Sequence, residues 1–190
     1  MYKRCTTERA AEQQHRFADC LLNCMQKTAY TKISISYLCE KTGLSRKTFY
    51  RLFDCKDDVL YALIDQTLRN CTTFHTAEED PSTLDRLGEL RQLFSYWYEQ
   101  KAVLNALHNN SLSTVLIFRA MEYALNEDSS WLTILGAANS PNSREILLFS
   151  MSGMTSLVID WCASGYQKTI PEMANLFWEL ASTPMLHLTD

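Results

Sequence analysis

The sequence is poor in the residues that interrupt helices. It has only 5 glycines and 4 prolines among 190 residues, which favours long helices joined by short turns. No uninterrupted apolar run approaches the roughly 18 residues that a membrane span needs. The first ten residues, MYKRCTTERA, lack the apolar segment of a secretory signal. We therefore expect an all-α protein located in the cytoplasm.

Signatures of enzymes and metal sites are also missing. The sequence has no nucleophile motif, no glycine-rich phosphate loop and no HExxH pair. His75, His108 and His187 do not combine with the carboxylates into a metal-ligand spacing. We expect no enzymatic activity, no bound metal and no cofactor.

The seven cysteines show no pattern of disulfides or zinc ligands. Their number is odd, and neither a CxxC motif nor a Cys/His pattern of the zinc type is present. Cys20 and Cys24 lie one helical turn apart, and Cys39 can pack near them. Reduced thiols that pack as small apolar side chains are the expected state. A thiol sensor or a metal site at Cys20 and Cys24 is the alternative.

Positive charge gathers at the start of an otherwise acidic chain. Residues 1–56 contain 11 Lys and Arg against 5 Asp and Glu, a net charge of +6. Residues 57–190 contain 7 against 17, a net charge of −10, and the whole chain has a net charge of −4. This asymmetry favours a polyanion as the partner of the first segment, although a solvated surface would show the same excess.

Residues 34–53 have the pattern of two helices joined by a tight turn. Ser34 can cap the first helix, and Gly43 can adopt the left-handed conformation that ends it. Ser45 can cap the second helix. Together they form a helix-turn-helix. The apolar residues that would share a core with a helix over 8–27 are Leu38, Leu44, Phe49 and Phe53.

The second helix of this unit presents polar and basic side chains on the side opposite its apolar residues. Arginine and lysine reach guanine acceptors in the major groove, hydroxyl groups hydrogen-bond to phosphate, and a helix N-terminus attracts anions. A helix that enters the groove by its first turns needs such side chains. The sequence therefore predicts contacts with double-stranded DNA from Arg46, Lys47, Thr48, Tyr50 and Arg51. A solvated helix face is the alternative interpretation.

The segment ISISYLCEKTGLSRKTFYRLFDCKDDVLYAL, residues 33–63, resembles the DNA-binding region of TetR-family transcriptional regulators. Spacing and residue types agree together over about 45 residues when the first helix is included. The match is carried by Ile33, Leu38, Cys39, Gly43, Leu44, Ser45, Thr48, Phe49, Tyr50, Phe53, Lys56 and the Val59-Leu60 pair.

The resemblance implies which residues contact DNA. Ser34 and Ser36 start the second helix of the family's DNA-binding region, and Tyr50 and Lys56 occupy positions that contact the phosphate backbone. Three basic residues fall in the recognition helix, where base contacts vary among members. The complete predicted set is Ser34, Ser36, Ser45, Arg46, Lys47, Thr48, Tyr50, Arg51 and Lys56.

Two positions depart from the family pattern. Leu52 stands where many members carry histidine, so no phosphate contact is expected from it. Cys55 stands where a capping Ser, Asp or Asn usually opens the fourth helix, and a thiol caps poorly. Asp57 and Asp58 partly compensate through the helix dipole. A redox role for Cys55 beside the DNA is the alternative.

The rest of the chain predicts a second helical domain. A helix-turn-helix domain over 1–55 is followed by a helical effector-binding and dimerisation domain over 56–190, with about nine helices in all. The polar segment HTAEEDPST, residues 75–83, is expected to be a connector. Helices are expected over 56–73, 84–101, 103–107, 111–126 and 143–164, and a last helix over the segment that follows Thr169.

Residues 143–164 carry an apolar seam of the coiled-coil type. Its members are Leu147, Met151, Met154, Val158 and Trp161, which recur at spacings of 4, 3, 4 and 3. Further apolar residues lie on other faces, so this helix must be buried on more than one side. Thr169 and Glu172 can form a capping box that begins the next helix.

The segment GMTSLVIDWCASGYQKTIPEMANLF, residues 153–177, is similar to the C-terminal domain of a TetR subset that resembles the regulator of dihydroxyacetone kinase genes. This similarity implies that the last two helices of each subunit form a four-helix dimer interface. An internal pair of core helices is the alternative. The predicted interface residues are Leu147, Met151, Met154, Val158, Trp161, Met173, Phe177 and Leu180.

The family resemblance also implies a small-molecule effector in the middle of the chain. An effector that prefers one separation of the two recognition helices changes DNA affinity by its differential affinity for the two states. The residues predicted to line its pocket are Phe94, Trp97, Tyr98, Phe118, Met121, Trp131 and Met154. An ordinary core is the alternative for any of them.

The sequence thus predicts a homodimeric repressor that a small molecule releases from a palindromic DNA operator. A DNA-bound dimer that acts as an activator, or that responds to a protein partner, is the alternative. No membrane partner is expected. Neither the operator sequence, the effector nor the regulated genes follow from the residues.

Overall fold

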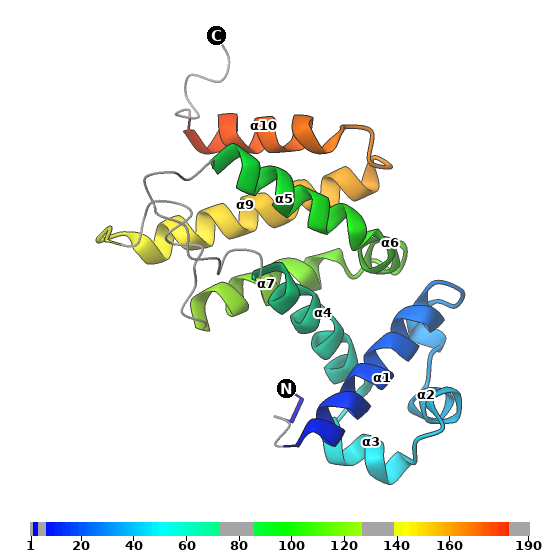
Figure 1. Cartoon of the computed structure of the whole chain (residues 1–190). Helices are drawn as coiled ribbons and strands as arrows, with labels where there is room; N and C mark the ends of the chain where they lie inside the picture. Colours follow the sequence, from blue (N-terminus) through cyan, green and yellow to red (C-terminus); the bar gives the residue numbers. More distant parts are fainter. Residues whose placement is uncertain (1, 4–6, 73–85, 127–138, 183–190) are drawn as a thin grey trace.

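The computed structural model describes residues 2–3, 7–72, 86–126 and 139–182. Within these ranges the chain forms nine α-helices and no strand, which confirms the predicted all-α class. Figure 1 shows a small unit made of α1, α2 and α3 at one end and a larger bundle at the other, with α4 between them. The predicted connector at 75–83 lies outside the described residues.

The small unit consists of α1 (Glu8–Met25), α2 (Ile35–Thr42) and α3 (Arg46–Leu52). Phe17 of α1 packs edge-on against Phe49 and Phe53, with ring centroids 5.3 and 5.8 Å away. All three rings are fully buried. Aromatic pairs of this geometry contribute about 0.5–1.5 kcal/mol beyond the burial of their area, so they fix the orientation of α3 relative to α1.

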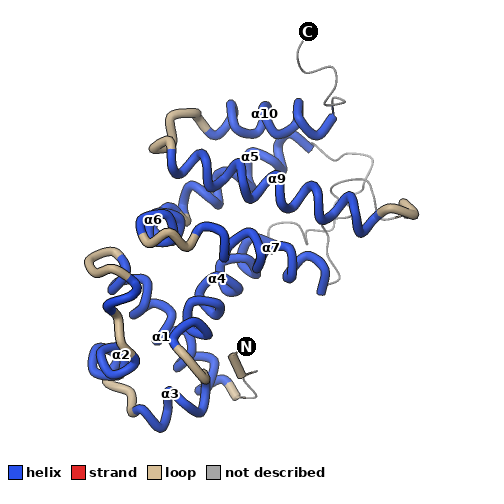
Figure 2. Tube along the Cα trace, turned by 180° about the vertical axis from the view of Figure 1, so that it is seen from behind, coloured by secondary structure: helices blue, strands red, loops and turns tan. Residues whose placement is uncertain are grey.

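The fourth helix joins the two parts. α4 (Lys56–Thr72) packs on α1 at one end and on α7 towards the other, and Figure 2 shows the same course from behind. A second link starts in the short 3-10 turn Tyr30–Lys32, where the Tyr30 N–H donates to Asn110 Oδ1, 2.6 Å away, at the end of α6. The small unit is therefore attached to the bundle at two places.

Within the described residues, the larger bundle contains five helices. They are α5 (Arg86–Glu99), α6 (Lys101–Asn109), α7 (Ser113–Asn126), α9 (Ser143–Ala163) and α10 (Ile170–Ser182). α9 packs along α7 and α6, whereas α10 packs along α5. The predicted capping box opens α10: the Thr169 N–H donates to Glu172 Oε2, 2.7 Å away, and the Glu172 N–H donates to Thr169 Oγ1 at 3.4 Å.

The predicted dimer seam faces the inside of the chain. Six of the predicted interface residues are at most 4 % exposed in the single chain: Leu147, Met151, Met154, Val158, Trp161 and Met173. Side chains buried within one copy have no surface left to contact a second copy. The spacing identified a buried seam correctly but could not say whether the same chain or another chain covers it. Phe177 and Leu180 remain half-buried at the surface.

The residues predicted to line an effector pocket do not face one cavity. Three of them, Phe94, Trp97 and Met154, are packed in the core and at most 3 % exposed. Tyr98 and Phe118 lie on the surface, 39 % and 67 % exposed, and Met121 is half-buried. Trp131 lies outside the described residues. Because aromatic residues at helical spacing serve a core as well as a pocket, the pattern alone did not separate the two.

Among the described helices, α9 is the one with the length and mean hydropathy, 1.5, of a membrane span. That criterion uses length and composition only, and core helices of water-soluble proteins also meet it. Seven residues of α9 are buried against the rest of the chain. The apolar residues on the inner side of α9 are therefore accounted for by packing within the bundle.

Candidate nucleic-acid interface

Two serine caps and one glycine set the angle between α2 and α3. Ser34 Oγ accepts from the Tyr37 N–H at 3.1 Å, and Ser45 Oγ accepts from the Thr48 N–H at 3.0 Å. Gly43 has φ 67° and ψ 18°, in the left-handed region, where a side chain is strained. The Leu44 N–H then donates to the Cys39 carbonyl at 3.2 Å and closes the turn. The predicted helix-turn-helix is confirmed.

The first turn of α3 carries an arginine that reaches back to α2. The Arg46 guanidinium donates to Ser36 Oγ at 2.5 Å and to Tyr50 Oη at 3.3 Å, and it lies over the Tyr50 ring at 5.8 Å. Arg46 and Ser36 are exposed, and Tyr50 is 43 % exposed. These contacts leave part of the guanidinium pointing outward, so one basic group bridges the outer sides of both helices.

The other predicted residues of α3 differ in their partners. Lys47 is exposed and has no hydrogen-bond or ion-pair partner within the described ranges. Arg51 donates to Gln13 Oε1 of α1, 2.6 Å away. Thr48 is half-buried, and its hydroxyl shares a hydrogen bond with Ser45. Lys47 is thus the basic side chain of α3 with the most freedom to reach a ligand.

Lys56 lies in a different environment from the rest of the predicted set. Its Nζ donates to the carbonyls of Tyr30 and Ile33, at 2.6 and 2.9 Å, and sits 3.9 Å from the centre of the Tyr30 ring. Burial lowers the pKa of this ammonium group. Two of its three N–H groups are therefore used to hold the α1–α2 connection against the start of α4.

The start of α4 is capped without a hydroxyl side chain. The carboxylate of Asp58 accepts from the N–H groups of Asp54 and Cys55, at 2.8 and 3.4 Å. Burial alone would raise the pKa of Asp58, but these hydrogen bonds lower it below its ordinary value. Asp57 meanwhile accepts from the Tyr30 hydroxyl. The expected compensation by these two aspartates thus operates through direct hydrogen bonds as well as the helix dipole.

Sequence reasoning missed three residues on this surface. Tyr37 and Lys41 occupy the outer face of α2, where the Lys41 ammonium lies 5.4 Å from the Tyr37 ring centre. Their spacing of four residues, on the side of the helix away from Leu38, was the sequence pattern that could have indicated them. Lys3 also reaches α3, because its Nζ donates to the Tyr50 carbonyl at 2.7 Å. No local pattern connects residues so distant in the chain.

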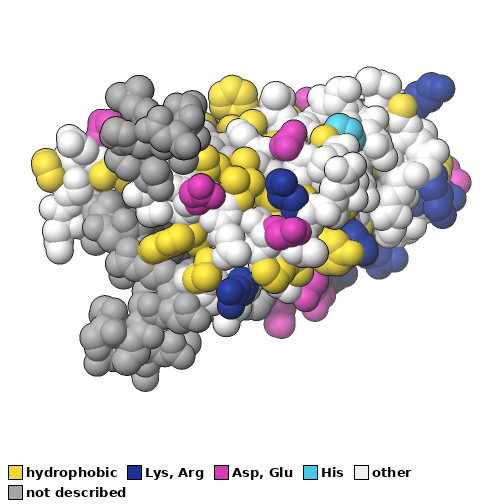
Figure 3. Space-filling view, turned by 90° about the horizontal axis from the view of Figure 1, so that it is seen from above, with side chains coloured by type: hydrophobic (Ala, Val, Ile, Leu, Met, Phe, Trp, Pro, Cys, Tyr) yellow, Lys and Arg dark blue, Asp and Glu magenta, His cyan; other side chains and the backbone are white. Residues whose placement is uncertain are grey.

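A second surface lies between α9 and α10. It is a groove of 870 Å³ whose lining is mostly apolar and includes Ile146, Phe149, Gly153, Leu157, Phe177 and Trp178. Phe149 is 64 % and Trp178 42 % exposed. Figure 3 looks down on the α10 end of the molecule and shows hydrophobic side chains exposed among acidic and basic ones. Large exposed apolar surfaces of this kind usually mark an interaction site.

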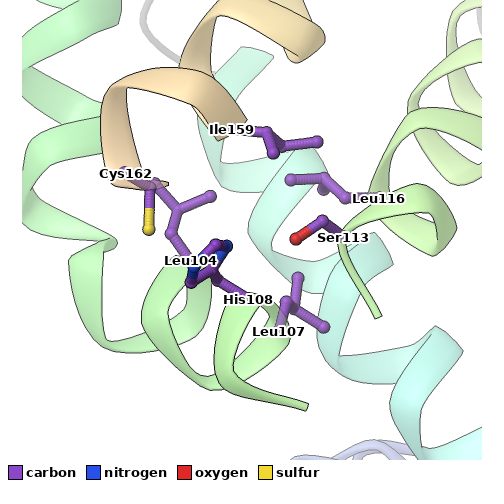
Figure 4. A pocket seen from close by; sticks show the side chains of 7 residues that line it. All are labelled: Leu104, Leu107, His108, Ser113, Leu116, Ile159 and Cys162. Atoms are coloured by element: carbon purple, nitrogen blue, oxygen red, sulfur yellow. The ribbon is translucent and has the colours of Figure 1, made fainter. Parts of the chain in front are cut away.

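The junction of α6, α7 and α9 is closely packed. Figure 4 shows side chains from these helices facing one another, among them Leu104, Leu116 and Ile159. The space between them does not admit a water-sized molecule. Cys162 contributes its thiol, which donates to Asn105 Oδ1 at 3.1 Å. A ligand could enter this junction only if the three helices moved apart.

Solved structures with a similar fold are transcriptional regulators. A protein from Syntrophomonas wolfei assigned to the TetR family aligns with a TM-score of 0.64 at 15% identity, over 93% of this chain and 98% of that one. A TetR-family regulator from Streptomyces coelicolor aligns with a TM-score of 0.59 at 15% identity, over 88% of this chain and 80% of that one.

A third similar structure is the dihydroxyacetone kinase operon activator DhaS. It aligns with a TM-score of 0.56 at 13% identity, over 88% of this chain and 93% of that one. Neither a protein-family model nor a curated protein sequence matches the chain. At these identities the likeness establishes the fold, and it agrees with both resemblances seen in the sequence. The chain therefore has the fold of TetR-family transcriptional regulators.

Proposed function

We propose that this protein is a DNA-binding transcriptional regulator of the cytoplasm that acts as a homodimer. The observation that carries the proposal is the outer side of α2 and α3, where Ser36, Arg46, Lys47 and Tyr50 are exposed together on a correctly capped helix-turn-helix. In this arrangement α3 enters the major groove by its first turn. The three similar structures support it, because all are named as regulators.

The geometry suggests different tasks for the residues of this surface. Lys47, which lacks a protein partner within the described ranges, reads base edges. Arg46 contacts a phosphate or a base from its place between Ser36 and Tyr50. The exposed serines Ser34 and Ser45, together with the N–H groups at the helix starts, bind backbone phosphates. Lys56 holds the α1–α2 connection in position with two of its N–H groups and has a third for a phosphate.

Dimerisation is proposed to occur at the groove between α9 and α10. Helices of two copies can approach closely at Gly153, because a Cβ atom built there meets no atom within 4 Å in the single chain. Phe149 and Trp178 supply exposed aromatic surface of the kind that dominates stable interfaces. A two-fold dimer would place two α3 helices for a palindromic operator with half-sites about 34 Å apart.

An effector site is supported by one buried polar atom. The indole Nε1–H of Trp97 is buried and has no acceptor among the described residues, and leaving such a donor unpaired costs about 1–3 kcal/mol. Because Trp97 is packed in the core at 2 % exposure, an effector with a carbonyl or other acceptor would satisfy this donor only if the surrounding helices moved apart to admit it. We propose that effector binding releases a repressor from DNA. One similar structure is named an operon activator, so activation is the second candidate.

Binding-site selection with the purified full chain against random duplexes tests the DNA-binding proposal. We expect enrichment of a palindromic sequence with two half-sites. A library without any enriched sequence at low ionic strength would contradict the proposal. The selected duplex is then used to screen for metabolites that release the protein from it. Trp97→Phe should lose the response that the wild type shows.

A further inference from the structure

The N-terminal segment Tyr2–Lys3 is bound to the end of the recognition helix. The Lys3 N–H donates to the Leu52 carbonyl at 3.1 Å, and Lys3 Nζ donates to the Tyr50 carbonyl at 2.7 Å. Lys3 Nζ also lies 3.1 Å from Asp54 Oδ1. These contacts satisfy two carbonyls at the C-terminal end of α3, which have no partner within a short helix. Lys3 therefore acts as a cap that comes from another part of the chain.

The same segment is anchored on its other side to α4. The Tyr2 hydroxyl donates to Asp65 Oδ2 at 2.8 Å, and its ring contacts Phe53 with centroids 6.4 Å apart. The Lys3 carbonyl accepts from Gln14 Nε2 of α1 at 2.8 Å. Figures 1 and 2 both place the short described segment at residues 2–3 near the part of α4 that adjoins the small unit. Two adjacent residues thus connect α3, α1 and α4.

Asp65 is in turn held by a residue of the bundle. Arg119 of α7 donates from Nε to Asp65 Oδ1 at 2.8 Å and from a terminal nitrogen to Oδ2 at 2.5 Å. The Asp65 side chain is 8 % and the Arg119 side chain 15 % exposed. Burial alone would lower the pKa of Arg119, but its bonds to Asp65 raise it, so the guanidinium stays charged. Bidentate pairs of this type have well-defined geometry.

We propose that Tyr2 and Lys3 form a strap that transmits the position of α7 to the recognition helix, through the ion pair between Arg119 and Asp65. The inference rests on the proposed function, because it assigns a regulatory role to contacts at the end of the proposed DNA-reading helix. The carboxylate of Asp65, on α4, accepts hydrogen bonds from both Arg119 of α7 and the Tyr2 hydroxyl. A shift of α7 relative to α4 must therefore break or redirect at least one of these bonds. If the Tyr2 bond changes, Lys3 moves with Tyr2, and its hydrogen bonds to the carbonyls of Tyr50 and Leu52 change as well.

Hydrogen exchange of the free full-length protein, made without an N-terminal tag, tests the strap without DNA. We expect Arg119→Gln and Tyr2→Phe each to raise exchange at the end of α3, near Leu52 and Phe53. If the strap transmits the effect, the double variant Tyr2→Phe/Arg119→Gln should show the same exchange at the end of α3 as Tyr2→Phe alone. Additive effects, or no change at α3, would overturn the inference.

DNA affinity gives the second readout. Tyr2→Phe removes one hydroxyl and keeps the ring against Phe53, so the fold should persist even if Arg119→Gln fails to fold. We expect two- to tenfold weaker binding of the selected duplex, about the effect of one hydrogen bond. Arg91→Gln is the matched control, because Arg91 is exposed on α5 without a described partner. It should leave both exchange at α3 and DNA affinity unchanged.

The outcomes separate the two proposals. Failure of the wild-type protein to select any duplex would contradict the proposed function, while the exchange experiment would still test the strap. Normal DNA binding with Tyr2→Phe and Arg119→Gln both indistinguishable from the wild type would overturn the strap alone.

Discussion

The α2–α3 unit and the α9–α10 pair both carry recognisable sequence patterns, yet they differ in what those patterns determine. In α3 the apolar residues Phe49 and Leu52 lie on one side and the basic residues on the other. In α9 apolar residues occupy both sides, so that Met154 faces the core while Phe149 faces outward. The buried side of a helix with one apolar side can be predicted from its sequence. For a helix with two apolar sides, the buried side depends on which helices pack against it.

The largest effect is expected on the inner side of α9. Met151 is 4 % exposed, so Met151→Asp places an uncompensated carboxylate in the core. Truncation of buried methionine alone costs about 2–5 kcal/mol, and a buried unpaired charge adds to this. We expect loss of the folded state or a large drop in unfolding temperature, measured by circular dichroism. A stable variant that merely becomes monomeric would restore the dimer-seam interpretation of this face.

The outer side of α9 should respond in the opposite way. Gly153 is exposed, and a Cβ atom built on it meets no atom within 4 Å in the single chain. Gly153→Glu should therefore keep the helical circular-dichroism signal while a dimer becomes a monomer, because two carboxylates would meet at the interface. Light scattering measures the mass, and Gly153→Ala is the matched control that should stay dimeric. An unchanged mass for Gly153→Glu would exclude this groove as the interface.

The DNA-facing side of α3 should affect function without affecting stability. Arg46 is exposed and bonded only to exposed groups, so Arg46→Ala should leave the unfolding temperature within about 2 °C, as expected for surface changes of about 0.5 kcal/mol. Affinity for the selected duplex should fall about tenfold or more, measured by fluorescence anisotropy. Unchanged affinity would indicate that Arg46 lies on a helix face that contacts only solvent and not DNA.

The smallest expected effect concerns the start of α4. Hydrogen bonds lower the pKa of Asp58 below its ordinary value of 3.8. Its stabilising contribution is therefore present above pH 3.8 and is lost as the pH falls through the lowered folded-state value. Asp58→Asn should lower the free energy of unfolding by about 1 kcal/mol at pH 7. Urea titrations of the wild type and the variant at pH 7 and near pH 3 measure this difference in the free energy of unfolding. A difference of equal size at both pH values would contradict the capping role of the Asp58 carboxylate.

The part of the fold that sequence could predict is the part controlled by local chemistry. Ser34, Gly43 and Ser45 act on their own neighbours in the chain, and their caps and turn were predicted correctly. The same is true of Thr169 and Glu172. Such residues carry their structural role in their type and spacing.

The remainder depends on contacts between distant segments. Tyr2, Asp65 and Arg119 meet although 63 and 54 residues separate the bonded pairs, and no periodicity indicates this. Lys56 matches the family position, but its two carbonyl partners come from the α1–α2 connection. The exposure of the residues predicted to line an effector pocket could not be predicted for the same reason, since Phe94 and Phe118 have the same side chain and opposite exposure.

The measurement that tests the central claim most directly is the salt dependence of duplex binding by the wild type, Lys47→Ala and Lys168→Ala. Lys47 lies on α3, whereas Lys168 is exposed in the turn before α10. Each lost phosphate contact reduces the slope of log K against log salt by about 0.9, and loss of a base contact lowers affinity by about 1–3 kcal/mol. We predict steep weakening with salt for the wild type, weaker binding for Lys47→Ala and wild-type behaviour for Lys168→Ala. Equal wild-type affinity at low and high salt, or equal affinities for both variants, would contradict the assignment of α3 as the DNA-reading helix.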